Sequence, residues 1–252
     1  MENGELEILV DEVKTLLDPW LNKSGGIFYS GRSTVTEGDF YLMGLNPGGD
    51  PIQVKDMISE SLSAWQTKSR PEDWSEYWHE SWLKNKEAKG EAPHQVRVID
   101  FCKNLLRQDV CTIFSANILF VRTSKEADLP RKGSEEYERL LTDCLKVHRR
   151  LLSIVRPKII VCLGNGPDSA FSKLKDWLKV LPQDVKDPGF QNPNRNRKFY
   201  IRWFDKPIKP ESGQEFDCRV VGVPHPSWFD LRSKEFHKAW ESLPLMSMIR
   251  TS

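Results

Sequence analysis

Three polar side chains end or interrupt apolar runs of this sequence, at places where they could serve chemistry. Asn46 ends the run DFYLMGLN, Asn117 lies inside VCTIFSANILFV, and His225 lies between two prolines in VVGVPHPSWF. An amide is no base at physiological pH, so Asn46 could only hold and orient a water molecule. A neutral imidazole could donate a hydrogen bond to a leaving group that gathers negative charge. Asn117 offers a donor and an acceptor, as needed to read the edge of a planar ligand.

Each of these residues also has a purely structural explanation, which is favoured when the residue is taken alone. An Asn before Pro-Gly is common in turns, an Asn in a strand can satisfy a neighbouring loop, and a His between prolines can mark a rigid bend. The shared position of the three at strand ends favours chemistry, because ligands of open α/β sheets bind at the carboxyl ends of the strands.

The elements that would position these side chains alternate along the chain. Buried strands are predicted at 38–45, 110–121, 158–164 and 218–223, with a further candidate at 198–204. Helices are predicted at 5–21, 52–65, 95–107 and 134–157, and after Pro167 and Ser233. This alternation predicts an α/β fold, a three-layer α/β/α sandwich with a central, mostly parallel four-stranded sheet. We expect a single domain over 1–252, with insertions at 66–93 and 179–215.

Composition limits the classes of partner. The 252 residues carry a net charge of +1, with 38% hydrophobic and 29% charged residues, so no global field draws the chain to DNA or a membrane. Binding to a polyanion must come from a local patch. The polar, acidic start MENGE is no signal peptide, and no apolar run approaches the roughly 20 residues of a spanning helix. We expect a cytoplasmic protein, associated with the nucleoid if it is bacterial.

Metal chemistry is not expected from the cysteines and histidines. The five cysteines contain no C-x-x-C pair, and the five histidines contain no closely spaced pair. Neither pattern has the ligand spacing of a zinc site or an iron–sulfur cluster. The prediction is therefore no metal and no cofactor.

Two motifs together carry a resemblance to a known family. GLNPG and HPS, in this order, resemble the signature motifs of the uracil-DNA glycosylase superfamily, and IFSANILFVRTS resembles its middle motif. The resemblance spans about residues 38–232. Asn in the first motif with His in the last is most similar to the single-strand-selective monofunctional uracil-DNA glycosylases. The resemblance implies a monomeric, DNA-binding hydrolase that flips out a pyrimidine and cleaves its N-glycosidic bond, giving an abasic site.

The resemblance also implies roles for the matching residues. Asn46 would hold the attacking water, His225 would stabilise the leaving base, and Asn117 would read the edge of the base. A flipped amide would fit cytosine instead of uracil, so Asn117 alone does not decide the base. Asp50 would be either a turn-capping carboxylate, which we favour, or the base that activates the water.

The walls of the implied base pocket are less clear. The turn would contribute Gly44, Leu45, Pro47 and Gly48. The best-known uracil enzymes carry a Tyr where Gly48 stands, so we expect tolerance of a substituent at the pyrimidine 5-position. The aromatic side chain that stacks on the base would be Trp65 or a residue of the Trp-rich insertion. In that insertion Trp74, Trp78 and Trp82 have helical spacing, typical of a core-packing stripe and less often of an aromatic wall.

DNA contacts are expected from two segments. Ser227 would contact a phosphate, and Trp228 and Phe229 would form a wedge that enters the duplex or, alternatively, pack under the last helix. The basic, aromatic-interleaved loop would add Arg195, Arg197 and Lys198, although a charged edge strand is an equally good explanation.

A non-catalytic reader of modified or damaged bases on the same fold is the alternative function. Asn46 together with His225 favours the enzyme, because a reader needs neither a water holder nor a leaving-group donor. The sequence leaves open whether the base is uracil, 5-hydroxymethyluracil, mismatched thymine or a hypermodified cytosine. It also leaves open the strand preference, and whether the chain serves base excision repair or defence against phage.

Overall fold

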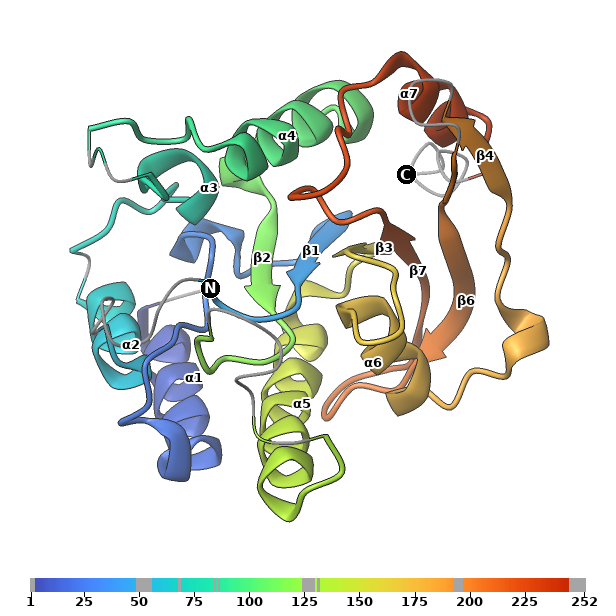
Figure 1. The fold of residues 1–252 in the computed structure, drawn as a ribbon. Helices are drawn as coiled ribbons and strands as arrows, with labels where there is room; N and C mark the ends of the chain where they lie inside the picture. The colour runs from blue at the N-terminus through green and yellow to red at the C-terminus, as the bar shows by residue number, and fades with distance from the viewer. Residues whose placement is uncertain are drawn as a thin grey trace.

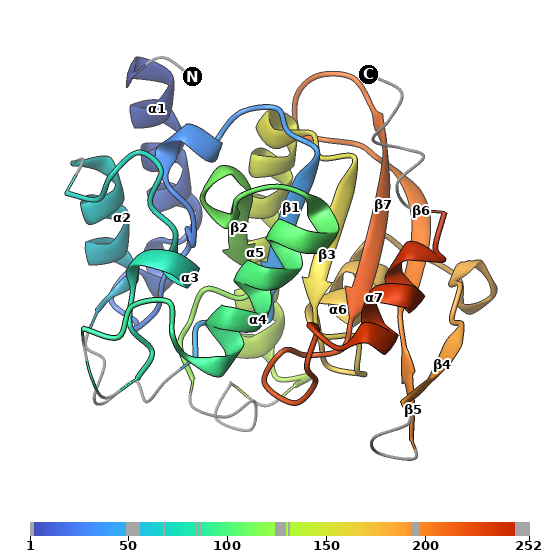
Figure 2. The same ribbon diagram turned by 90° about the horizontal axis from the view of Figure 1, so that it is seen from above.

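The computed structural model describes residues 3–48, 56–67, 69–83, 85, 87–123, 130, 132–192 and 197–244. One sheet has the strand order β2-β1-β3-β7-β6 (Figure 1), and β4 and β5 form a separate pair (Figure 2). The strands are β1 (Phe40–Gly44), β2 (Phe114–Asn117), β3 (Ile159–Leu163), β4 (Gly189–Asn192), β5 (Arg197–Tyr200), β6 (Arg202–Ile208) and β7 (Phe216–Val223).

The predicted mostly parallel sheet is confirmed, but it has five strands instead of four. β2, β1, β3 and β7 are parallel, and β6 is antiparallel to β7 at the edge. The candidate strand at 198–204 covers two strands, because the chain passes from β5 to β6 at Ile201. β6 exposes Asp205 and contains Pro207, so it lacks the continuous apolar run of a central strand.

Helices cover both faces of the sheet (Figures 1 and 2). They are α1 (Asn3–Leu16), α2 (Ile58–Gln66), α3 (Glu76–His79), α4 (Pro93–Phe101), α5 (Glu135–Val155), α6 (Ala170–Trp177) and α7 (Lys234–Glu241). Tyr41 and Met43 of β1 contribute to one core with α1, α2, α5 and α6, whereas Phe40 and Leu42 contribute to the other with α4 and α7. This alternation follows from the two-residue period of a strand and gives the three predicted layers.

The helix starts follow local capping chemistry. The Ser134 hydroxyl accepts from the Tyr137 N–H at the start of α5, and the Ser233 hydroxyl accepts from the Phe236 N–H at the start of α7, as predicted. The helix expected after Pro167 begins only at Ala170, because the cap is Ser169. Among the described residues, no helix combines the length and the apolar character needed to cross a bilayer.

Candidate active site

Three parallel strands end side by side where the candidate residues lie. β3 pairs with β1 on one side and with β7 on the other. Asn46 follows β1 by two residues, Gly164 follows β3 directly, and His225 follows β7 by two residues. Because neighbouring strands lie about 4.8 Å apart, the loops of Asn46 and His225 leave the sheet roughly 10 Å from each other. A planar ring with an attached sugar fits that span.

The Asn46 side chain is oriented by two hydrogen bonds. Its Nδ2 donates to the Thr123 hydroxyl (2.9 Å) and to the Pro47 carbonyl oxygen (3.0 Å). Both amide hydrogens are used, and in the described part of the chain no donor reaches Oδ1. The half-buried amide therefore offers a fixed acceptor that suits a water molecule. Asp50, the alternative water-activating group, lies outside the described residues.

The turn after β1 is held by the segment after β2. The N–H groups of Ile118 and Leu119 donate to the carbonyls of Gly44 and Leu45, both at 2.9 Å. The Arg122 guanidinium donates to the Gly48 carbonyl. Within the turn, Leu45 is half-buried against the core and Pro47 is buried, whereas Gly48 is exposed. A Cβ added to Gly48 would meet nothing within 4 Å, so this end of the turn borders open space.

The Asn117 side chain packs tightly against Gly44 of β1. It is 4% exposed, and a Cβ on its partner Gly44 would lie only 2.1 Å from its Oδ1. Below it, His148 Nε2 donates to the Asn117 carbonyl (2.9 Å) and Nδ1 accepts from the Tyr41 hydroxyl (2.7 Å). Burial lowers the pKa of His148 to about 4, so this support is neutral. Asn117 Nδ2 is buried and has no hydrogen-bond partner in the described part of the chain.

Gly44→Ala is expected to destabilise the protein by about 1–3 kcal/mol, because the new methyl group overlaps the Asn117 amide. The free energy of unfolding in urea measures this loss. Gly166→Ala is the matched control, since a Cβ there meets nothing within 4 Å. Equal stability of the two variants would show that Gly44 is not required to seat Asn117.

His225 has a defined tautomer. Its Nδ1 accepts from the Ser227 backbone N–H at 3.2 Å, which leaves the proton of the neutral ring on Nε2. Burial lowers the pKa of His225 below its ordinary value, so the ring is neutral near pH 7. Gly164, with φ +132°, leaves the end of β3 bare, and a Cβ there would contact the imidazole at 3.4 Å. The arrangement presents a neutral N–H donor at the carboxyl edge of the sheet.

A row of aromatic rings, formed by Tyr29, Tyr77, Trp82 and His94, leads from the side of Asn117 to His225. Trp82 lies 6.5 Å from Tyr29, 5.5 Å from Tyr77 and 5.2 Å from His94, measured between ring centroids. His94 in turn lies 5.2 Å from His225, with the two rings perpendicular. Of this row the sequence suggested only Trp82, as part of the Trp-rich insertion. Tyr77 and His94 lie near Trp82 in the sequence but carry no motif, and Tyr29 comes from a distant segment of the chain.

Polar groups border this row. Glu76 accepts a hydrogen bond from the Trp82 indole N–H (3.1 Å), and burial raises the pKa of its carboxyl group. Burial, and then the negative charge of Glu76, raise the pKa of Tyr29. The positive charge of Arg122 and the Asn117 side chain lower that pKa in part. The Tyr29 hydroxyl is therefore neutral and lies close to the Asn117 amide.

Trp65 belongs to the core and not to the open edge. It is 2% exposed, stacks on Phe28 at 4.3 Å, and donates from Nε1 to the Ser30 carbonyl (3.0 Å). A base could not reach its ring, which leaves the Trp-rich insertion, where Trp82 is the tryptophan that lies in the row of rings. The predicted helical stripe is wrong as well: α3 has only four residues, and Trp74 is buried whereas Trp82 is 37% exposed. Trp78 is 53% exposed.

The residues predicted to contact DNA divide into exposed and packed ones. Trp228 is 78% exposed and Ser227 is exposed, whereas Phe229 packs on Phe199 (4.9 Å) and Phe236 (5.8 Å). Trp228 is thus exposed enough to act as a wedge in DNA, whereas Phe229 packs against the last helix.

The basic loop is described only in part. Arg195 lies outside the described residues, and so does the side chain of Arg197, the first residue of β5. Lys198 is exposed. Arg202, in contrast, is held by Asp187 at 3.1 Å, so its charge is already paired.

Two cavities of the structure are lined by none of Asn46, Asn117 and His225. One, of about 570 Å³, lies at the amino ends of the strands and is lined by Asp39, Gln108 and Lys158 among others. The other, of about 260 Å³, is lined by Asn165, Arg202 and neighbours. The first is at the wrong edge for ligand binding in an open α/β sheet.

The chain matches no protein-family model and no curated protein. In the described ranges no three His, Cys, Asp or Glu side chains are grouped closely enough to hold a metal ion. Function is therefore inferred from the residues and their geometry.

Proposed function

We propose that this chain is a monofunctional DNA glycosylase that flips a pyrimidine out of DNA and hydrolyses its N-glycosidic bond, leaving an abasic site. One observation carries the proposal: Asn46 and His225 lie on loops at either side of the end of β3, and Gly164 places no side chain between them. The resemblance of GLNPG and HPS to the motifs of the uracil-DNA glycosylase superfamily supports it.

In this proposal His225 carries the larger share of catalysis. Breaking the glycosidic bond leaves negative charge on the departing base, and no described carboxylate contacts Asn46 to activate the water. The barrier must then fall mainly through stabilisation of the base anion. The neutral His225 Nε2–H would donate to the 2-carbonyl oxygen of the pyrimidine, where that charge gathers.

Asn46 would place the nucleophile. Its Oδ1 would accept a hydrogen bond from a water molecule on the sugar side of the bond, while Thr123 and the Pro47 carbonyl fix the amide plane. A water held in a near-attack position saves the entropy of bringing it there. The proton of the water leaves to solvent as the new C1′–O bond forms.

Recognition of the base would fall to Asn117 and Trp82. Asn117 Nδ2, which is buried close to the Tyr29 hydroxyl, suits the 4-oxygen of uracil or of a 5-substituted uracil, and Trp82 would lie against the ring of the base. Trp228 would fill the stack that the flipped nucleotide leaves.

The pH dependence of turnover follows from His225. Since burial lowers its pKa below 6.5, the neutral ring persists as the pH falls through 6.5. Protonation at Nδ1 would break the bond from the Ser227 N–H and turn the ring. We expect kcat to be constant from mildly alkaline pH to 6.5 and to decline only below it. Single-turnover rates, with circular dichroism to verify folding, test this; a decline centred above 6.5 would contradict it.

A cleavage assay tests the proposed function. Oligonucleotides carrying one uracil, 5-hydroxymethyluracil, mismatched thymine or modified cytosine, each single- and double-stranded, are incubated with the protein and then treated with alkali. We expect a strand break at the marked position for at least one base, and none before alkali. A mobility shift without breaks across the whole panel would instead support the non-catalytic reader.

A further inference from the structure

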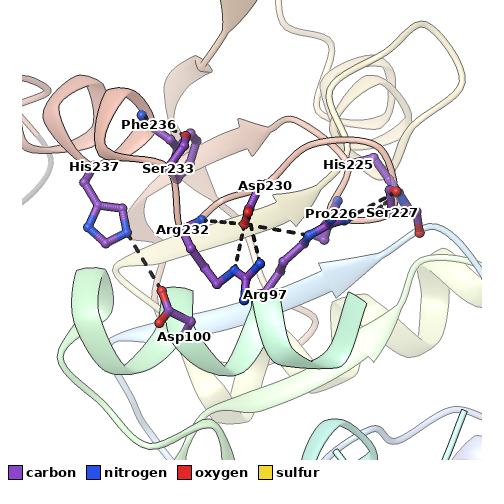
Figure 3. A network of polar contacts seen from close by, with 10 residues as sticks. All are labelled: Arg97, Asp100, His225, Pro226, Ser227, Asp230, Arg232, Ser233, Phe236 and His237. Carbon is purple, nitrogen blue, oxygen red and sulfur yellow. Dashed lines mark hydrogen bonds and ion pairs between the residues drawn. The ribbon is translucent and has the colours of Figure 1, made fainter. Parts of the chain in front are cut away.

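The loop after β7, residues 224–232, is attached to α4 by main-chain contacts (Figure 3). The Arg97 guanidinium donates from Nη1 to the carbonyl oxygens of Pro226 (2.5 Å) and Ser227 (3.3 Å). One guanidinium group thus holds the peptide units on both sides of Ser227, including the unit that carries the Ser227 N–H. Two hydrogen bonds from Nη1, to two successive carbonyl groups, restrict the backbone at that point more than a single hydrogen bond would.

His94, one turn before Arg97 on α4, adds a side-chain contact. Its Nδ1 shares a hydrogen bond with the Ser227 hydroxyl at 3.1 Å, and its ring stands perpendicular to that of His225. Burial, and then the neighbouring His225 and Arg97, lower the pKa of His94 to about 3. A neutral His94 places no repelling charge beside His225.

These contacts act on the group that fixes the His225 tautomer. The Ser227 N–H donates to His225 Nδ1 at 3.2 Å, so the orientation of this peptide unit decides which ring nitrogen keeps the proton. Without that donor, a neutral imidazole distributes its proton over both nitrogens. The position of the Ser227 backbone therefore sets whether a donor N–H or a bare nitrogen faces the site.

Further contacts fix Arg97 itself. Its Nε lies 3.7 Å from an Asp230 carboxylate oxygen, and Asp230 is also bound by Arg232 at 2.8 Å. The hydrogen bond from Arg232 is the main cause that lowers the pKa of Asp230, so this carboxylate is charged at neutral pH. Arg97 thus connects α4 to the loop at two places, the carbonyls of Pro226 and Ser227 and the carboxylate of Asp230.

We propose that His94 and Arg97 are positioning residues that hold the Ser227 peptide against His225 and thereby keep its proton on Nε2. The catalytic meaning of this inference rests on the proposed function, but the effect on the tautomer does not. Neither residue would touch the substrate. Their effect would reach the base through His225 alone.

Nitrogen-15 NMR of the histidine rings tests the inference. The neutral tautomers differ in the shifts of Nδ1 and Nε2, and the spectrum of His225→Gln identifies the signals of His225. At neutral pH we expect wild-type His225 in the Nε2–H form. We expect Arg97→Ala and His94→Phe to shift its two nitrogens toward each other as the tautomers mix. His94→Asn can still bond the Ser227 hydroxyl and should retain the wild-type pattern.

Arg150→Ala is the matched control for Arg97→Ala. Arg150 pairs with Glu12 at side-chain exposures of 23% and 43%, close to the 21% and 43% of Arg97 and Asp230. It lies on α5, which covers the other face of the sheet, and should leave the His225 signals unchanged. Thermal unfolding of all variants identifies any that do not fold, in which case Arg97→Lys replaces Arg97→Ala.

The outcomes separate the two proposals. Mixed tautomers in His94→Phe and an Arg97 variant support the positioning role, even if the chain cleaves no base. If glycosylase activity is present, kcat should fall roughly fivefold to tenfold in these variants with KM nearly unchanged. Wild-type His225 shifts in both folded variants would overturn the inference and leave the proposed function standing.

Discussion

His225→Ala is expected to lower kcat for base release by about 10²–10³-fold, the typical effect of removing one donor to a developing oxyanion. The affinity for uncleaved DNA should change little, because the hydrogen bond from His225 strengthens only as negative charge gathers on the departing base. Single-turnover release of the base measures the rate, and fluorescence anisotropy measures the binding.

His237→Ala serves as the control for His225→Ala. His237 is also half-buried, but it lies on α7, where its Nε2 is 3.9 Å from a carboxylate oxygen of Asp100 (Figure 3). We expect a change of less than about twofold, as for a surface substitution away from special features. Similar losses in both variants would point to a general effect on folding rather than to a donor role for His225.

Asn46→Ala is expected to lower kcat by about 10²-fold, because a reacting group misplaced by 1 Å has an effect of that size. Thr123→Val, which removes one acceptor of the Asn46 amide, should reproduce a smaller part of the loss, roughly fivefold. Rates of base release measured alongside DNA affinity separate the two effects. Asn104→Ala is the control, since the Asn104 amide donates to Asp100 on an exposed surface.

Binding decides how the Asn46 result is interpreted. If Asn46→Ala loses affinity and turnover equally, Asn46 recognises DNA and does not place a water. If turnover falls while affinity holds, the contribution is confined to the transition state.

Local pattern was sufficient to predict the sheet and the loops that carry Asn46 and His225. Buried parallel strands are short apolar runs, and the turn residues that follow them mark the carboxyl edge. β6 was not counted in the predicted four-stranded sheet because an antiparallel edge strand tolerates charge and proline. The tautomer of His225 also has a local cause, the N–H of Ser227 two residues later.

The walls of the site could not be predicted, because they depend on contacts between distant segments. His94 and Arg97 are separated from Ser227 by 133 and 130 residues, and no spacing rule connects them. Trp65 was a reasonable candidate from its distance after GLNPG, but the buried face of α2 takes it into the core. Burial of a single aromatic depends on which side of its helix meets the sheet.

The most direct test of the central claim is to identify both products by mass spectrometry, after incubation of a marked oligonucleotide with excess protein. We expect the free pyrimidine together with an unbroken strand that lacks only that base, and far less of both products at the same incubation time with His225→Ala. An intact strand that stays bound and keeps its base, for every base of the panel, would contradict it.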